Sequence, residues 1–214
     1  MDQQQSAPSA MIAIIDYDIG NLAAVSNMLR RIGHDSAITA DPEVIKSADR
    51  IILPGNGHFD TCMKNFRATG LVPLIERRVF EDRVPLLGIC VGAQMLGSGS
   101  EEGAEPGLGW FDMKVRRLPR SDGLRVPHMG WNRVGRAAPH HYIVQGLDED
   151  ARFYFVHSYY LDPGESVDVL LTVEYGITFA AGVSRGNVSG VQFHPEKSHR
   201  FGKQLLLNFA EGRG

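Results

Sequence analysis

Cys90 lies at the centre of a segment, residues 85–95 (PLLGICVGAQM), whose residue types suit nucleophilic chemistry. Residues 85–89 are apolar, as in a strand buried in a parallel sheet, and residues 93–96 are good helix formers. A cysteine at the tight turn between a strand and a helix is the sulfur counterpart of the nucleophile elbow. Aligned N–H groups at a helix N-terminus favour the thiolate there. The alternative is a buried core cysteine between two loop glycines.

A second segment supplies a base for such a nucleophile. Residues 188–193 (VSGVQF) are typical of a strand and lead directly into His194, Pro195 and Glu196. Side chains two positions apart in an extended chain point to the same side, and the proline stiffens that geometry. A carboxylate beside an imidazole fixes its tautomer and stabilises its cation. The residues therefore predict a Cys90–His194–Glu196 triad. Taken alone, His194 would be an ordinary histidine at a strand end, and Glu196 would be a solvated charge.

These side chains need a scaffold that brings them together, and the first half of the chain alternates between strand and helix patterns. Strands are predicted at residues 11–16, 36–39 and 50–53, and helices at residues 21–32, from Pro42, and within residues 65–80. Such alternation predicts a parallel sheet with helices on both faces, in which ligands bind beyond the carboxyl ends of the strands. Cys90, residues 55–57 and His194 all follow such ends.

The second half of the chain is richer in short β segments. Strands are predicted at residues 113–118, 131–134 and 153–156, with a hairpin joined around Tyr175 and Gly176. No linker or repeat divides the chain, so we expect one domain over residues 11–214, preceded by a disordered tail at residues 1–10. The predicted fold class is α/β, a mostly parallel central sheet with helices on both faces and a small antiparallel β layer.

Composition excludes several classes of function. A net charge of −3 and a pI near 6.2 provide no field for nucleic acid or an anionic membrane. Two cysteines define no disulfide framework, and no apolar run approaches the roughly 18 residues of a membrane helix. The N-terminal residues lack a signal-peptide pattern. We therefore expect a cytoplasmic protein, and because the histidines do not cluster with Cys or Asp, no metal or other cofactor.

Several motifs together resemble the class I, triad-type glutamine amidotransferases, and most of all the glutaminase subunits of imidazole glycerol phosphate synthases. In family order they are IIDYDIGNL (14–22), LPGNGHF (53–59), GICVGAQ (88–94), SEEG (100–103), VPHMGWN (126–132), YFVHSYY (154–160) and GVQFHPEKS (190–198). The elbow and HPE motifs are shared by many amidotransferases, while HMGWN and FVHSYY are more specific. The resemblance implies a flavodoxin-like fold and hydrolysis of L-glutamine to glutamate and ammonia through a γ-glutamyl thioester.

The resemblance also implies roles for further residues. Gly55, Asn56 and Gly57 would form the oxyanion strand, with one donor from the peptide joining Asn56 to Gly57 and another from the Val91 amide. The glutamine α-amino and carboxylate groups would be held by Gln94, Ser158 and Tyr159, while the His157 imidazole is expected to be a core group. Residues at the interface with the synthase subunit would be Trp131, Asn132 and Lys197, although each could equally be ordinary surface or packing.

Asn56 and Asp18 depart from the family pattern, as does the pair His58 and Phe59, where the family more often has small apolar residues. Asn56 stands where the family usually has Val, and Asn reaches positive φ more readily than a β-branched residue. We therefore expect the oxyanion loop to form more easily and glutamine hydrolysis to depend less on a partner, the alternative being a residue that simply fits a turn. Asp18 stands where the family pattern has Gly, which alters the local backbone but not the predicted triad.

The chain has no phosphate-binding motif of its own, neither GxxxxGKS/T nor GxGxxG after a strand. It is therefore expected to be half of an enzyme, and the resemblance implies a (β/α)8-barrel cyclase subunit as the partner in a heterodimer. One alternative is the glutaminase of a paralogous pair that serves amidination of surface-polysaccharide sugars. A more distant alternative is a peptidase-like or stress-protein relative with the same elbow and no ammonia chemistry.

Overall fold

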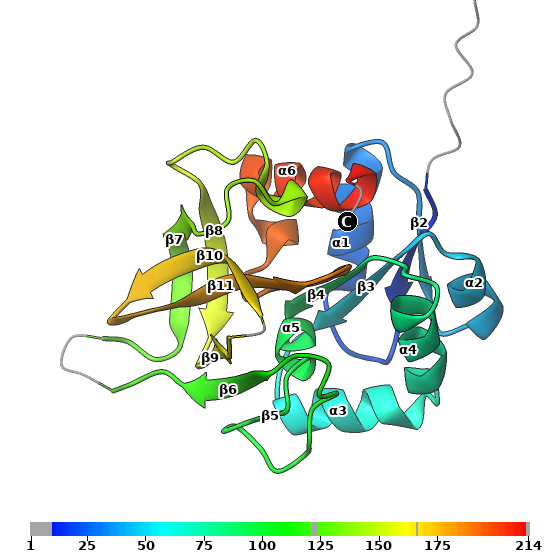
Figure 1. Ribbon diagram of the computed structural model, residues 1–214, viewed down its shortest axis with the longest axis horizontal. Coiled ribbons are helices and arrows are strands. Elements are labelled where there is room, and N and C mark those ends of the chain that lie inside the picture. Colours follow the sequence, from blue (N-terminus) through cyan, green and yellow to red (C-terminus); the bar gives the residue numbers. More distant parts are fainter. Residues whose placement is uncertain (1–9, 121–123, 166, 213–214) are drawn as a thin grey trace, which may run out of the picture.

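A single continuous sheet organises the molecule in the computed structural model, which describes residues 10–120, 124–165 and 167–212 (Figure 1). Among these residues, twelve strands form the sheet, whose main path runs β2-β1-β3-β4-β12-β11-β10-β7-β8. The strands are β1 (Ile12–Ile15), β2 (Ser36–Thr39), β3 (Arg50–Gly55), β4 (Leu86–Cys90), β5 (Gly99–Ser100), β6 (Met113–Arg117), β7 (His128–Arg136), β8 (Arg152–His157), β9 (Tyr159–Pro163), β10 (Asp168–Tyr175), β11 (Ile177–Arg185) and β12 (Val188–Val191).

The N-terminal half of the sheet is parallel, as the sequence predicts. Strands β2, β1, β3, β4 and β12 pair in parallel, and β1, β4 and β12 are buried along their whole length because helices cover both faces. The helices are α1 (Leu22–Arg31), α2 (Pro42–Ser47), α3 (Phe59–Ala68), α4 (Val72–Phe80), α5 (Val91–Met95) and α6 (His199–Glu211). Figure 1 shows α1 and α6 on one side of these strands and α3 and α4 on the other. The carboxyl ends of β3, β4 and β12 consequently meet at one edge.

The remaining strands are antiparallel and extend the same sheet. β11 pairs with β12 and β10, which continues through β7 to β8, while β9, β6 and β5 branch from the main path. The predicted hairpin is formed by β10 and β11, and its turn residue Gly176 has φ of +70°. The predicted antiparallel layer is therefore a continuation of the central sheet.

Three of these strands and helices lack a counterpart in the sequence-based prediction: β5, β9 and α6. The helix α6 buries apolar residues at helical spacing, among them Phe201, Leu205 and Phe209, so its pattern was present in the sequence. The helical region expected within residues 65–80 is two helices and begins earlier, at Phe59, because the His58 ring accepts a hydrogen bond from the Asp60 amide and caps α3.

Residues 1–9 of the predicted N-terminal tail lie outside the described residues. A search of the helices that the structure describes finds none with the length and apolar character needed to cross a membrane.

Candidate active site

The turn between β4 and α5 holds Cys90 in a strained conformation. Its φ of 55° and ψ of −113° fall in a sparsely populated region of backbone conformations, which a residue other than glycine adopts only when the surrounding structure holds it there. The backbones around it are so close that a Cβ on Gly92 would lie 1.9 Å from the Leu53 carbonyl oxygen, and one on Gly88 would lie 2.8 Å from Ala93 Cα. Both glycines are therefore needed for the close packing of the elbow.

His194 lies three residues after the end of β12, at the same edge of the sheet as Cys90. Its Nδ1 is 2.8 Å from Glu196 Oε1, and the two side chains are only 3% and 1% exposed. The Ser198 hydroxyl donates to the His194 carbonyl at 2.6 Å and accepts from the Tyr154 amide at 3.0 Å, which holds the segment against β8. Glu196 reaches the imidazole from a short 3₁₀ helix, Pro195–Lys197, and not from the extended segment that the sequence predicts.

The surroundings of His194 favour its charged form. Burial by itself lowers the pKa of the ring, but its interactions with Cys90 and with the Glu196 carboxylate outweigh burial and raise the pKa to about 9. Because Glu196 accepts from Nδ1, the nitrogen that faces away is Nε2, which is buried and makes no hydrogen bond among the described residues. The arrangement can hold a thiolate–imidazolium pair and keeps Nε2 free to move a proton.

The loop that follows β3 lies against the elbow. A Cβ on Gly55 would lie 2.3 Å from the Gly92 amide nitrogen, so the two backbones are in direct contact. The Cys62 thiol donates to the Asn56 carbonyl at 3.4 Å, and burial raises the pKa of Cys62 to about 11, so it stays a thiol. The C=O and N–H of a trans peptide point in opposite directions, so the Gly57 N–H points away from Cys62.

The structure changes the interpretation of two departures from the family pattern, Asn56 and Asp18. Positive φ falls on Gly57, at +91°, and not on Asn56, so the physical reason for expecting easier formation of the oxyanion loop is missing. Asp18, by contrast, has φ of +64°. A glycine adopts this conformation without steric cost, which explains the family preference, and Asp is among the residues that tolerate it best.

A small cavity of about 50 Å³ adjoins Cys90. It is lined by Asn56, Gly57, Cys90, Val91, Gln94, Glu102, Val156, His157, Ser158 and Tyr159. The structure thus brings together every oxyanion and substrate residue predicted from the sequence except Gly55, which packs behind the elbow. A space of this size holds a few waters beside the sulfur.

Gln94 is held by two hydrogen bonds from its side-chain nitrogen. Nε2 donates to the Tyr159 carbonyl at 3.2 Å and to Gln192 Oε1 at 3.1 Å. The same Tyr159 carbonyl lies 2.8 Å from His157 Nδ1, and His157 Nε2 lies 3.0 Å from His128 Nδ1. The His157 imidazole is thus a buried, hydrogen-bonded core group, as expected. Burial lowers the pKa of His128 to about 4 and, with the neighbouring imidazole, that of His157 to about 3.

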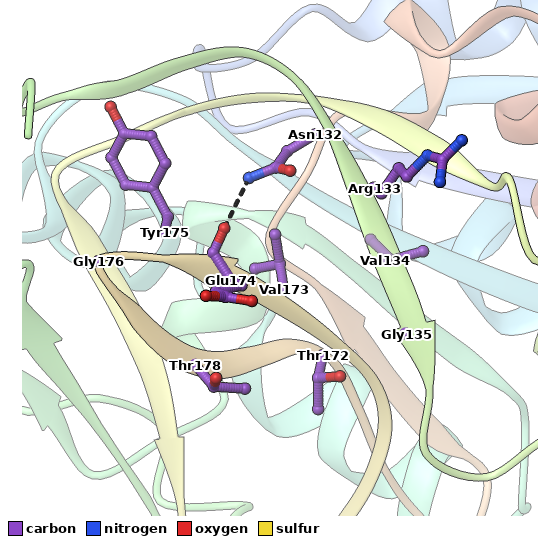
Figure 2. A pocket seen from close by; sticks show the side chains of 10 residues that line it. All are labelled: Asn132, Arg133, Val134, Gly135, Thr172, Val173, Glu174, Tyr175, Gly176 and Thr178. Atoms are coloured by element: carbon purple, nitrogen blue, oxygen red, sulfur yellow. Dashed lines mark hydrogen bonds between the residues drawn. The ribbon is translucent and has the colours of Figure 1, made fainter.

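The three residues predicted at a partner interface lie in different environments. Trp131 is 44% exposed and stacks on His199 at 5.3 Å, and Lys197 Nζ lies 5.9 Å from the Tyr154 ring. The Asn132 amide is engaged internally, since it donates to the Glu174 carbonyl at 3.0 Å. Figure 2 shows this bond at the rim of an open cavity of about 630 Å³, which shares no lining residue with the Cys90 cavity.

Three residues without a predicted role also shape the site. Glu102, from the SEEG motif, accepts from the Phe59 amide at 2.8 Å and lines the Cys90 cavity, where a carboxylate suits an ammonium group. The Tyr17 hydroxyl is buried and donates to the Pro54 carbonyl, which holds the loop from behind. Gln192 is wholly buried beside Cys90. In the sequence, Gln192 could have been noticed as a polar residue within the largely apolar predicted strand at residues 188–193.

A search of the described residues finds no group of three His, Cys, Asp or Glu side chains placed to hold a metal ion.

Comparison with known proteins agrees with this geometry. Residues 13–211 match the family described as "Glutamine amidotransferase class-I", and the chain belongs to that family. It is 52% identical to imidazole glycerol phosphate synthase subunit HisH 2 of Pseudomonas aeruginosa, over 94% of this chain and 99% of that protein. It is 46% identical to the subunit of the same name from Methanococcus maripaludis, over 93% and 98% of the two chains.

Solved structures show the same architecture at lower identity. One crystal structure of a glutamine amidotransferase superposes with a TM-score of 0.73 at 24% identity, covering 93% of this chain and 97% of the other. At this identity the likeness concerns the fold, and it confirms the predicted α/β class.

Proposed function

We propose that this protein is the glutaminase subunit of an imidazole glycerol phosphate synthase, which hydrolyses L-glutamine and passes the ammonia to a (β/α)8-barrel cyclase subunit in a heterodimer. The observation that carries the proposal is 52% identity over 94% of the chain to a synthase subunit, combined with Cys90, His194 and Glu196 at one sheet edge. Residues 11–214 form the amidotransferase domain in this proposal, and the protein acts in the cytoplasm.

In the proposed reaction Cys90 is the nucleophile. Its thiolate attacks the side-chain amide carbon of glutamine, and the His194 imidazolium gives its proton to the leaving ammonia. The product is a γ-glutamyl thioester. His194 then takes a proton from a water molecule, which attacks the thioester and releases glutamate. Glu196 keeps the ring in the orientation that leaves Nε2 facing the reacting atoms.

Two backbone amides are the proposed oxyanion donors. The Val91 N–H is at the first position of α5 and has no partner within the helix, and the Gly57 N–H points away from Cys62. Both residues line the cavity beside Cys90. Donors aimed at the developing negative charge typically contribute about 100- to 1000-fold each to turnover.

The glutamine substrate is proposed to bind with its α-ammonium group facing Gln94 and Glu102 and its α-carboxylate on the backbone at Ser158 and Tyr159. All four residues line the cavity. The proposed partner surface includes Trp131 and Lys197, since an exposed tryptophan is a frequent anchor at protein interfaces. Asn132 contributes there through its backbone or through packing, because its side-chain amide is already engaged.

The decisive experiment measures glutamate release by the purified chain, alone and with candidate barrel cyclases. We expect turnover with a histidine-pathway cyclase and loss of at least about 1000-fold in Cys90→Ser. Growth of a histidine auxotroph lacking its own glutaminase subunit, restored by this chain but not by Cys90→Ser, would assign the pathway. Absence of glutamate release with every cyclase, together with unlabelled Cys90 after treatment with a glutamine-analogue electrophile, would contradict the proposal and favour a peptidase-like relative.

A second candidate function is the glutaminase of a paralogous pair for amidination of surface-polysaccharide sugars. The observation that favours it is the number 2 in the names of both relatives described above, which indicates a second subunit of this kind in those organisms. The auxotroph decides between the two. Glutaminase activity with a cyclase-like partner but no restored growth on medium without histidine would support the second candidate.

A further inference from the structure

Gln192 is a buried polar side chain with no role in the mechanism above. It lies one residue after β12 and two before His194, and its relative exposure is 0%. Its Nε2 is 3.8 Å from Cys90 Sγ, within the range of hydrogen bonds to sulfur, and its Oε1 accepts from Gln94 Nε2 at 3.1 Å. A single amide therefore touches both the nucleophile and a residue of the proposed substrate site.

The direction of these hydrogen bonds is set by a backbone group. The Tyr159 carbonyl can only accept, so the Gln94 atom that faces it must be the nitrogen Nε2. The second N–H of that nitrogen then points at Gln192, whose facing atom must be the acceptor Oε1. Consequently the Gln192 atom that faces Cys90 is its NH₂ group, a donor. Reversing either amide would place two donors or two acceptors against each other.

We infer that Gln192 is a positioning residue for the nucleophile, donating a hydrogen bond that stabilises the Cys90 thiolate while its oxygen holds Gln94. The inference rests on the proposed glutamine hydrolysis and deepens it. In a site where Cys90 is only 3% exposed, few waters can reach the sulfur anion, and a fixed N–H supplies part of the stabilisation that bulk water would give.

The same amide also prepares the substrate site. Both N–H groups of Gln94 are committed, one to Tyr159 and one to Gln192, so the group that Gln94 offers to a ligand is its oxygen Oε1. An amide oxygen accepts from an ammonium group. Gln192 thereby links the stabilisation of the Cys90 thiolate to the orientation of the Gln94 amide, which is proposed to bind the α-ammonium group of glutamine.

The test reads the thiolate directly, without glutamine. Iodoacetamide alkylation of the full chain is followed as a function of pH, and the peptide containing Cys90 is quantified separately from the one containing Cys62. Gln192→Met keeps the volume and removes the donor. We expect its rate at pH values below the alkylation midpoint to fall about tenfold, which is a shift of the midpoint by about one pH unit to higher pH. Gln192→Glu keeps the acceptor for Gln94 and is expected to react no faster than Gln192→Met.

The matched control is Ser189→Ala, a buried polar residue on β12 whose hydroxyl bonds to Ser184, and its alkylation profile should coincide with the wild type. A profile of Gln192→Met that coincides with the wild type would assign Gln192 to packing alone and overturn the inference. Should Gln192→Met not fold, Gln192→Leu, which also removes the donor without adding a charge, carries the same comparison. Glutamine kinetics are measured in parallel, where we expect a lower kcat and a higher KM; a wild-type chain without turnover would count against the proposed function and leave the alkylation result intact.

Discussion

Two buried histidine regions of this molecule have opposite electrostatics. His194 interacts with Cys90 and lies 2.8 Å from the Glu196 carboxylate, and the two neighbours together raise its pKa to about 9. His128 and His157, which lie 3.0 Å from each other, have theirs lowered to about 4 and about 3. Their other hydrogen-bond partners are the Asn132 amide and the Tyr159 carbonyl, which carry no net charge.

The difference shows that burial alone does not decide the charge of an imidazole. The three rings are 3%, 3% and 6% exposed, so water is excluded from all of them to a similar extent. Burial disfavours the cation in each case, and only His194 has neighbours that reverse the effect. One region is therefore suited to proton transfer and the other to rigid packing beneath the substrate site.

The strongest way to break the comparison is to remove the carboxylate. Glu196→Gln takes away the charge that holds the His194 cation and should reduce glutamine turnover by about 10³- to 10⁴-fold. The measurement is steady-state glutamate release with the same partner for all variants. Glu211→Gln is the control, because the Glu211 carboxylate, 61% exposed, also lies beside an imidazole, that of His34 at 3.3 Å, and its loss should leave turnover unchanged. Turnover of Glu196→Gln within tenfold of the wild type would contradict the proposed role.

The corresponding change in the second region should affect stability more than chemistry. His157→Leu removes the partner of His128 Nδ1 and one of the two partners of the Tyr159 carbonyl, which keeps Gln94 Nε2. Leaving a buried group such as His128 Nδ1 unpaired costs about 1–3 kcal/mol. Urea unfolding gives the free energy of unfolding. His157→Gln, which can keep a donor and an acceptor, should lose less, and equal losses in the two variants would argue that packing, not hydrogen bonding, is what matters there.

Stability at acidic pH tests the sign of the lowered pKa values. The folded pKa values of His128 and His157 lie below the unfolded value of about 6.5, so between that pH and about 4 the unfolded chain binds more protons. The free energy of unfolding should therefore fall as the pH drops through this window. His157→Gln should show a shallower fall than the wild type, and parallel curves would refute the assignment.

A smaller effect is expected at the alkaline end. The raised pKa of His194 means that its imidazolium persists at neutral pH and is lost as the pH rises through about 9. Its contribution to stability is complete below about pH 6.5 and disappears over the same rise. Glutamine turnover should decline near pH 9, and the residual activity of Glu196→Gln should decline at lower pH, whereas Glu211→Gln should follow the wild type. An alkaline limb that does not move in Glu196→Gln would show that Glu196 does not support the cation.

Residue spacing was sufficient to find the elbow and most of the parallel half of the sheet. The glycines around Cys90 and the apolar runs at β1, β3 and β4 are local features, and β2 and α2 were predicted at the residues where they occur. The helix α6 escaped notice although its apolar spacing was regular. The strand β9 could not have been found in this way, because it is defined by its antiparallel partner β6 and has little pattern of its own.

In the candidate site, too, the residues that belong to local motifs could be predicted from the sequence and the others could not. Cys90, His194 and Glu196 could be proposed from short motifs because strained turns and strand ends need particular residue types close together in the sequence. Glu102 and Gln192 lie within recognised motifs, but no role could be predicted for either residue. The groups that they contact are distant in the sequence, so nothing near them in the chain indicates those contacts. Asn56 shows the opposite case, in which a local propensity for positive φ was not used by the fold.

The sequence by itself determined the chemical groups of this protein: one cysteine at a sharp turn, one histidine followed two residues later by a carboxylate, and the order of strands that carries both to one sheet edge. Only the tertiary structure decided the electrical state of those groups. The charge of a buried imidazole depends on its neighbours, which are Cys90 and the Glu196 carboxylate for His194 and uncharged groups for His157. The orientation of the Gln192 amide that faces Cys90 is set through Gln94 by the carbonyl of Tyr159, which is 65 residues from Gln94 in the chain.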